Sequence, residues 1–334
     1  MRRFVRTVWS LALALAIALI TLWASLALWY RVPFAEAIRG LAASAFALDG
    51  LATIVAVFTR VRRPALIAFL AAFAAMLAWW STIHPRADGD WSPDVARQTT
   101  GVIEADTLTL TDVRDFDWRS NSDFTERWTT RSYDLSKLKT IDLFMTYWSG
   151  PKIAHPIVSF GFEGGEFIAW SIEVRALRGG EFSPIADFFR NSALVIIAAD
   201  ERDVVRLRTS ILGEQVQLYR LRASPQVARA VLLEYVADAN ALAQTPRFYN
   251  SLITNCTTAI VKIVRLAGVN VSFDWRLIIN GFLPDFLYER GAINTRIPLA
   301  ELKARAQISA RAHEVDASPD FSRLIRVGAL LPWQ

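Results

Sequence analysis

Long apolar stretches dominate the first 84 positions of the sequence. The run 8–30 contains no charged residue and exceeds the roughly 20 residues that a helix needs to cross a bilayer. It is also too long for the apolar segment of a cleavable signal peptide. The run 64–83 has the same character, whereas the run 41–59 is weaker because it contains Asp49. We predict three transmembrane helices at 8–30, 41–59 and 64–83.

The positions of the arginine residues indicate whether the chain crosses the membrane two or three times. Residues 1–84 hold eight arginines and no lysine, with clusters at 2–6 and at 60–63. Positively charged loops remain cytoplasmic, and both clusters can do so only if two crossings separate them. The stretch 41–59 is therefore expected to span, although a mid-membrane carboxylate costs about 2.5–3.5 kcal/mol. This predicts a multi-pass protein of the cytoplasmic (inner) membrane, with everything after residue 84 on the periplasmic side.

The distribution of charge along the chain indicates which classes of partner can be excluded. The formal net charge is +5, and this excess comes from the arginines that flank the apolar runs, because the rest of the chain is nearly balanced. We therefore expect no nucleic-acid partner. A single cysteine excludes a disulfide framework within the chain. No spacing typical of a metal or cofactor site is present, so none is expected.

Residues 85–90 predict a linker, and residues 91–334 predict one soluble extracytoplasmic domain. Alternating or continuous apolar runs indicate strands, and helical periodicity behind good N-cap residues indicates helices. The expected strands are 102–113, 140–147, 153–162, 166–175, 193–199, 215–221 and a closing strand at 321–331; the expected helices are 200–211, 224–243, 256–267 and 299–310. This mixture of elements predicts the α+β class.

Two of these strands should form a hairpin around Gly164 and Gly165. If Glu163 pairs with Glu166, His155 lies across from Val174. Glu173 and Arg175 then become neighbours of the imidazole, within a register error of one or two residues.

The only cysteine lies where a polar loop becomes a helix. Asn255 is a favoured N-cap residue, which places Cys256 in the first helical turn. Free backbone N–H groups and the helix dipole stabilise a thiolate at that position. We interpret Cys256 as a nucleophile. The simpler alternative is that Cys256 is a small buried hydrophobic residue.

A thiol nucleophile needs a base, and the chain offers only three histidines. His84 lies at the predicted membrane exit and His313 in the C-terminal tail, which leaves His155 on a strand as the predicted base. A third polar group should orient the imidazole, and Glu173 is preferred over Ser171 for this role. The alternative is a histidine at a sheet edge with an ordinary satisfied hydrogen bond.

Four separated segments carry a resemblance to a known family. They are the segments 155–162 (HPIVSFGF), 171–175 (SIEVR), 199–209 (ADERDVVRLRT) and 249–258 (YNSLITNCTT). Over roughly residues 91–281 they resemble the N-terminal periplasmic domain of the Lnb-type lipoprotein intramolecular transacylases. More distantly, they are similar to permuted papain-like folds of the NlpC/P60 and lecithin:retinol acyltransferase kind. The resemblance implies an antiparallel sheet with packed helices.

The resemblance also implies an activity. It suggests a membrane-tethered thiol acyltransferase that moves an acyl chain from a lipoprotein diacylglyceryl ester to an N-terminal amine through a Cys256 thioester. Matching positions make Cys256 the nucleophile and His155 the base. The Asn255 amide and the N–H groups of Thr257 and Thr258 are candidates for stabilising the oxyanion. The expected partners are the lipid bilayer and a lipoprotein or other lipid-linked substrate.

Two other functions remain open from the sequence. The first is a cysteine amidase or peptidase that acts on cell-wall peptides with water as the acceptor. The second is a non-catalytic envelope protein in which Cys256 is merely packed.

Overall fold

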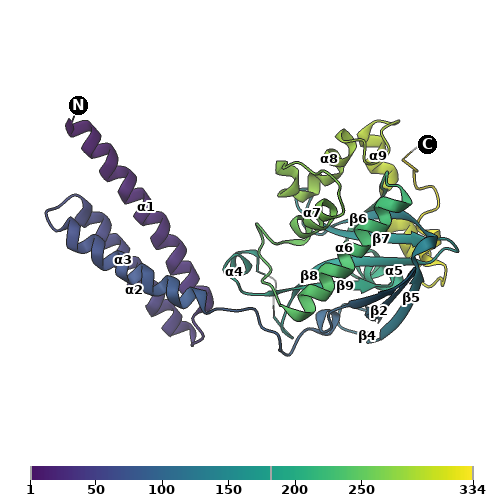
Figure 1. The fold of residues 1–334 in the computed structure, drawn as a ribbon, viewed down its shortest axis with the longest axis horizontal. Coiled ribbons are helices and arrows are strands. Elements are labelled where there is room, and N and C mark those ends of the chain that lie inside the picture. Colours follow the sequence, from purple (N-terminus) through teal and green to yellow (C-terminus); the bar gives the residue numbers. More distant parts are fainter. Residues whose placement is uncertain (1, 181–182, 333–334) are drawn as a thin grey trace. The chain divides into compact units, whose positions relative to one another are not determined.

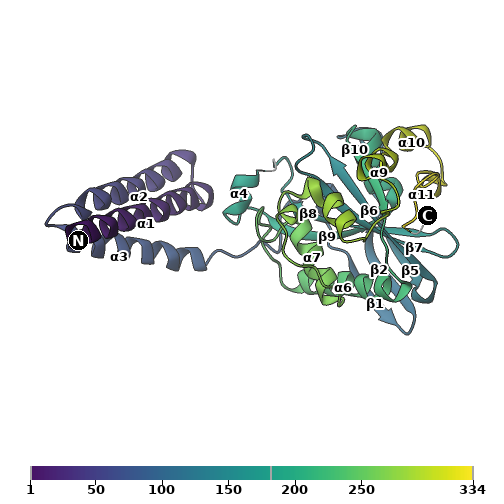
Figure 2. The ribbon, with the colours of Figure 1, turned by 90° about the horizontal axis from the view of Figure 1, so that it is seen from above.

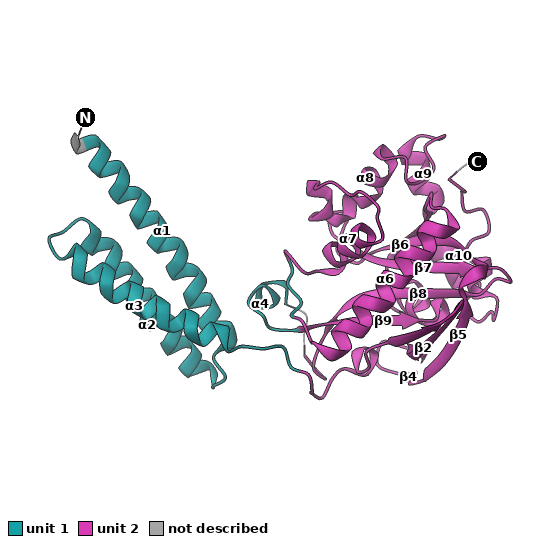
Figure 3. Cartoon of the chain, viewed as in Figure 1, with its two compact units in different colours: residues 1–86, 183–192, 248–251 teal, residues 87–182, 193–247, 252–334 magenta. Residues whose placement is uncertain are grey.

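The computed structural model describes residues 2–180 and 183–332, and it divides into two compact units (Figure 3). The first unit comprises residues 1–86, 183–192 and 248–251. The second unit comprises residues 87–182, 193–247 and 252–334. Two short segments from the expected soluble domain therefore pack with the N-terminal helices.

Three helices form the body of the first unit. They are α1 (Arg2–Arg31), α2 (Glu36–Val57) and α3 (Arg62–Ser81), and each is long and apolar enough to cross a membrane. Helices α1 and α2 approach most closely at Gly50, where an added Cβ atom would lie 2.0 Å from Thr21 Oγ1. Glycine at this position therefore permits the close packing of the two helices.

The short helix α4 (Pro184–Phe188) and the residues after it belong to the same unit. The Phe189 ring stacks on Tyr30 with centroids 5.6 Å apart. The Arg190 guanidinium donates a hydrogen bond of 2.8 Å to the Trp80 carbonyl. These contacts explain why residues 183–192 separate from the rest of the later chain.

An eight-stranded sheet forms the core of the second unit. Its strands are β1 (Thr100–Glu104), β2 (Thr107–Arg114), β5 (Trp128–Asp134), β6 (Leu138–Tyr147), β7 (His155–Phe162), β8 (Phe167–Arg175), β9 (Ala193–Ala199) and β10 (Gln215–Arg220). The strand order is β1-β2-β9-β8-β7-β6-β10, and β5 pairs with β2. All pairings are antiparallel except β2 with β9, so the sheet is mixed. A separate two-stranded ribbon joins β3 (Asp117–Trp118) to β4 (Phe124–Thr125).

Helices cover both faces of this sheet (Figures 1 and 2). Helices α6 (Pro225–Gln244) and α7 (Cys256–Leu266) cover one face, where Tyr235 packs against Phe160 and Trp170. Helices α5 (Glu201–Arg206), α10 (Ser309–Glu314) and α11 (Phe321–Leu324) share a core cluster with Ile157 and Ile197 on the other face. Helices α8 (Leu283–Glu289) and α9 (Leu299–Ala306) complete the unit. The predicted α+β class is confirmed.

Four predicted elements differ from the structure. The predicted strand 102–113 is divided into β1 and β2, which pair antiparallel across a turn at Ala105 and Asp106. The predicted closing strand 321–331 is wrong, because this stretch begins with α11, which directs Phe321 and Ile325 into the core at helical spacing. The predicted helix 299–310 is interrupted between α9 and α10, where the Ile308 N–H donates to the Val216 carbonyl. The predicted helix 200–211 becomes a π-helical turn after Arg206, at Leu207–Ile211.

The hairpin register differs by one residue from the predicted one. The Phe162 N–H donates to the Glu166 carbonyl at 2.9 Å, so the loop contains three residues. Gly164 and Gly165 adopt φ values of +94° and +87° in that loop, which glycine allows without strain. Ile157 pairs with Ser171, and the same register places His155 across from Glu173. Because β7 lies between β6 and β8, His155 is not at a sheet edge.

Buried ion pairs join the C-terminal segment to the sheet. The Arg326 guanidinium contacts Glu201 at 2.5 Å and Asp142 at 2.8 Å, and both carboxylates are at most 1% exposed. Arg220 also pairs with Asp142. A buried carboxylate that loses its partner is strongly destabilising.

We therefore expect Arg326→Met to lower the free energy of unfolding by about 3–5 kcal/mol. Arg323→Met is the matched control, because Arg323 pairs with Asp320 at the exposed surface and should matter far less. Thermal unfolding of the full chain in detergent measures both variants. Equal effects of the two substitutions would contradict this account.

Candidate active site

The β7–β8 hairpin brings His155 next to both residues that were considered for orienting it. His155 Nε2 lies 2.7 Å from Ser171 Oγ and 3.0 Å from Glu173 Oε1. The Ser171 hydroxyl itself donates to Glu173 Oε1 at 2.6 Å. Nε2 must therefore carry a proton to donate to this pair. In the neutral imidazole, that leaves Nδ1 as the acceptor.

Cys256 is the first residue of α7. Asn255 Oδ1 accepts a hydrogen bond from the Thr258 N–H, and Thr258 Oγ1 accepts one from the Asn255 N–H, both at 2.9 Å. This reciprocal capping box fixes the first helical turn. The Cys256 side chain is 8% exposed and lies close enough to His155 to raise the pKa of the imidazole. The structure thus brings the predicted nucleophile, base and orienting carboxylate together.

His155 and Glu173 each stabilise the charged form of the other. Burial works to lower the pKa of His155, but the negative charge of Glu173, the hydrogen bond that the carboxylate accepts from the imidazole, and the nearby Cys256 outweigh this and raise the pKa to about 9. Burial works to raise the pKa of Glu173, but His155, Arg208 and Ser171 hold it well below its usual range. At neutral pH the pair is therefore an imidazolium and a carboxylate. A cation of this kind beside the sulfur is what thiol-dependent catalysis requires.

Arg208 is a residue of this network to which the sequence analysis assigned no role. Its Nη2 lies 3.3 Å from Glu173 Oε1, and its Nη1 lies 3.2 Å from Glu214 Oε1. It projects from the π-helical turn that interrupts the predicted helix 200–211, and such turns recur at functional sites. The only signal in the sequence was its place in the segment 199–209 that carries the resemblance.

Asn280 is the second residue that the sequence analysis missed. Its Oδ1 accepts from the Ala154 N–H at 2.9 Å, and its Nδ2 donates to the Ala154 carbonyl at 2.6 Å and to Thr257 Oγ1 at 2.7 Å. Ala154 precedes the base and Thr257 follows the nucleophile, so one side chain joins the two catalytic segments. Gly281 makes this approach possible, because a Cβ atom there would lie 2.1 Å from the Pro151 carbonyl oxygen.

The three residues considered for the oxyanion take different positions. The Thr258 N–H is used by the helix cap, and Asn255 Oδ1 accepts it. The Thr257 hydroxyl is held by Asn280, whereas its backbone N–H lies in the first turn, where helix donors lack intrahelical acceptors. Thr257 is therefore the best placed of the three, and the oxyanion role stays a prediction.

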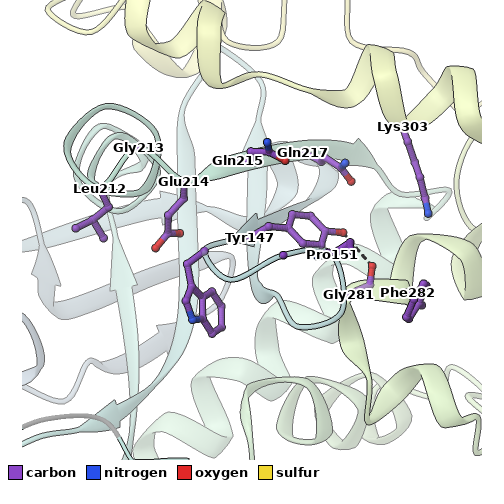
Figure 4. Close-up of a pocket in the computed structure, with 12 residues that line it drawn as sticks. Tyr147, Pro151, Leu212, Gly213, Glu214, Gln215, Gln217, Gly281, Phe282 and Lys303 are labelled. Atoms are coloured by element: carbon purple, nitrogen blue, oxygen red, sulfur yellow. Dashed lines mark hydrogen bonds between the residues drawn. The ribbon is translucent and has the colours of Figure 1, made fainter.

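A polar groove of about 740 Å³ lies beside this network (Figure 4). Glu214, which shares Arg208 with Glu173, forms part of its wall together with Gln217 and Lys303. The Tyr147 hydroxyl donates to the Gly281 carbonyl at 3.1 Å along the same wall. Among residues 2–180 and 183–332, no cluster of three or more His, Cys, Asp or Glu side chains could hold a metal ion.

The raised pKa of His155 predicts how stability depends on pH. A group whose pKa is higher in the folded state stabilises the fold fully below its unfolded value, near 6.5, and loses this contribution as pH rises to about 9. The contribution is at most about 3 kcal/mol. We expect the melting temperature to fall between pH 6.5 and 9, and His155→Gln to weaken this fall. Identical pH profiles for the two proteins would rule out the ion pair.

Asn280→Ala should slow every reaction of Cys256, because it removes the side chain that aligns the two catalytic segments. Asn294→Ala is the matched control, since Asn294 is equally buried and donates to the distant Leu331 carbonyl. Both variants should lose about 1–3 kcal/mol of stability. Only Asn280→Ala should reduce the rate of Cys256 acylation, followed by intact-protein mass spectrometry. Equal rates in the two variants would remove Asn280 from the site.

Comparison with known proteins gives one family match, and it covers the part of the chain that contains these residues. Residues 124–281 match the family described as the Lnb N-terminal periplasmic domain, and the matched region contains His155, Glu173, Arg208, Cys256 and Asn280. Searches of the curated proteins and of the solved structures give no match. Residues 124–281 of the chain are thus similar to the Lnb N-terminal periplasmic domain.

Proposed function

We propose that this protein is a membrane-tethered thiol acyltransferase. It would move an acyl chain from the diacylglyceryl ester of a lipoprotein to an N-terminal amine. The observation that carries this proposal is the buried contact between Cys256 and His155, with Glu173 3.0 Å behind the imidazole. The family match supports it, because this domain family is the one that the separated sequence segments resemble.

The geometry supports a two-step transfer. His155 holds the proton of the Cys256 thiol, and the sulfur attacks the ester carbonyl carbon. The resulting tetrahedral intermediate expels the glyceryl oxygen, which takes the proton from His155, and a thioester remains. The acceptor amine then attacks the thioester and gives a proton to His155. The departing sulfur recovers that proton, so the product is an amide and the free thiol is restored.

Glu173 and Arg208 would act through His155. Glu173 keeps the Nε2 proton in place, so that Nδ1 faces the sulfur in each step. Arg208 contacts the same carboxylate oxygen and holds Glu173 in its ionised form. Both are therefore positioning residues.

The N-terminal helices give the reaction its location. We propose that α1, α2 and α3 cross the inner membrane and hold the catalytic domain on its periplasmic side. Lipoprotein esters lie at the bilayer surface, so a tethered enzyme meets them at a high effective concentration. The bilayer and its lipoproteins would then be the partners of this chain.

A cysteine amidase or peptidase is the second candidate. The polar groove beside Glu214 favours it, because a groove of about 740 Å³ lined by Gln217, Lys303 and Tyr147 suits a peptide. Water would replace the amine as the acceptor. Incubation of the full chain with peptidoglycan fragments separates the two candidates, since release of free stem peptide with unchanged lipoprotein would favour hydrolysis.

The transfer is tested in vesicles that contain the full chain and a diacylated lipoprotein, with mass spectrometry of the lipoprotein N-terminus. Cys256→Ala should abolish N-acylation. Glu173→Gln should lower its rate by about 100-fold or more, because the imidazole loses its orientation. Glu163→Gln, in the exposed loop of the same hairpin, should leave the rate unchanged. Equal acylation by wild type and Cys256→Ala would refute the proposal.

A further inference from the structure

An apolar cavity of about 400 Å³ lies inside the second unit, between the sheet and helices α6, α7 and α8. Leu143 and Val158 of the sheet, Val231 of α6, Val264 of α7 and Phe286 of α8 are among its lining residues. Its volume lies within the range of small-molecule pockets, and such pockets are mostly apolar. Protein interiors are otherwise close-packed, so an empty space of this size is unfavourable unless something fills it.

The charge of the lining points to one kind of occupant. Of the lining residues that the structure describes, only Arg222 and Arg290 are charged, and both are exposed to solvent. The deeper walls, including Val158 and Leu283, are buried and apolar. A largely apolar space whose only charged lining residues are exposed to solvent suits a flexible hydrocarbon chain.

Residues next to the reactive pair in the chain line the buried end of this cavity. Thr257, which follows the nucleophile, and Pro156, which follows the base, both line it. Thr257 is 1% exposed, and Pro156 is also buried. Cys256 and His155 themselves do not line the cavity, but Thr257 brings its wall to the residue next to the nucleophile.

Tyr235 lies at the same end and carries an unused donor. Its ring is fully buried between Phe160 and Trp170, and it lines the cavity. Among the described residues, its hydroxyl has no hydrogen-bond partner. Burial raises the pKa of Tyr235, and the nearby Cys256 raises it further. A buried hydroxyl without a partner is rare and is often satisfied by a ligand.

We propose that this cavity holds the long acyl chain of the Cys256 thioester, and that the Tyr235 hydroxyl donates a hydrogen bond to the thioester carbonyl oxygen. The inference rests on the proposed function, since the acyl group arrives through that reaction. The chain would run from the sulfur past Thr257 and between Val231 and Val264. Each methylene that it buries raises affinity about fourfold, so the site selects long-chain over short-chain donors.

Photo-crosslinking tests the cavity without any turnover. The full chain with Cys256→Ala, in lipid nanodiscs, is irradiated with a palmitic acid that carries a diazirine near its chain end, and labelled peptides are mapped by mass spectrometry. We expect labels on α6 and α7 near Val231 and Val264. Val264→Trp should reduce them at least tenfold, and the milder Val261→Phe should reduce them if the first variant is poorly folded.

Leu266→Trp is the matched control for the crosslinking, because Leu266 is on the same helix, is 58% exposed and does not line the cavity. It should leave the labelling of α6 and α7 unchanged. Labels confined to α1, α2 and α3, or labels on α6 and α7 that persist in both cavity-filling variants, would overturn the proposal.

Acylation of the thiol tests chain selection. Wild-type protein is treated with the nitrophenyl esters of acetate and palmitate, and the acyl-enzyme is followed by intact-protein mass spectrometry. Val264→Trp should lower the ratio of the palmitoyl to the acetyl rate at least tenfold, whereas Leu266→Trp should not change it. An unchanged ratio in Val264→Trp would overturn the cavity assignment. If neither ester acylates Cys256, the proposed function is wrong, and the crosslinking still shows whether the cavity binds an acyl chain.

The role of the hydroxyl is tested separately. Tyr235→Phe should lower both acylation rates at least tenfold, because a donor to the developing oxyanion is lost for either chain length. Tyr133→Phe is the control, since Tyr133 is also buried in the sheet but stacks on Phe162 and does not line the cavity. Equal rates for the wild type and Tyr235→Phe would remove the hydroxyl from the proposal.

Discussion

The cross-strand contact between His155 and Glu173 is the interaction on which the site depends. It follows from the register of β7 and β8, which the three-residue loop at Glu163–Gly165 sets. Successive side chains alternate between the faces of a sheet, so a shift of one residue would turn Glu173 away from the imidazole. Because β7 is an interior strand, its pairing on both sides holds this register. The buried charges are tolerable because each has a hydrogen-bonded partner.

The nucleophile comes from a different part of the fold, and its placement requires a second constraint. The capping box at Asn255 and Thr258 fixes the start of α7, and Asn280 ties that start to the residue before β7. Gly281 lets the two loops approach closely enough for this bridge. The segments that carry Cys256 and His155 therefore share a single support, which would suit the proposed reaction because that reaction needs close alignment of sulfur and imidazole.

Features encoded by local pattern were largely predictable from the sequence. The apolar runs of the N-terminal helices, the cap at Asn255 and the continuous apolar strand at 193–199 each depend on neighbouring residues alone. The pairing of Cys256 with His155 was also accessible, because the chain has only one cysteine and three histidines. The exact register was not, since two-residue and three-residue loops are both compatible with two consecutive glycines.

Features that depend on contacts between distant segments could not be predicted from the sequence. Arg208 and Asn280 have no distinguishing local pattern, and their roles arise only when the hairpin, the π-helical turn and the loop before α8 meet. The segment 321–331 was misread because its apolar residues fit a strand as well as a helix. Its helical form is decided by the fit of Phe321 and Ile325 into the core.

The separation of the two reactive residues along the chain has a consequence for biosynthesis. About 100 residues lie between His155 and Cys256, and they include β8, β9, β10 and α6. Closing a connection of that length is slow, and it requires the intervening elements to be in place. The contact between Cys256 and His155 therefore forms only after the elements between them have folded. The pairing of these two side chains is in this sense a reporter of complete assembly of the second unit.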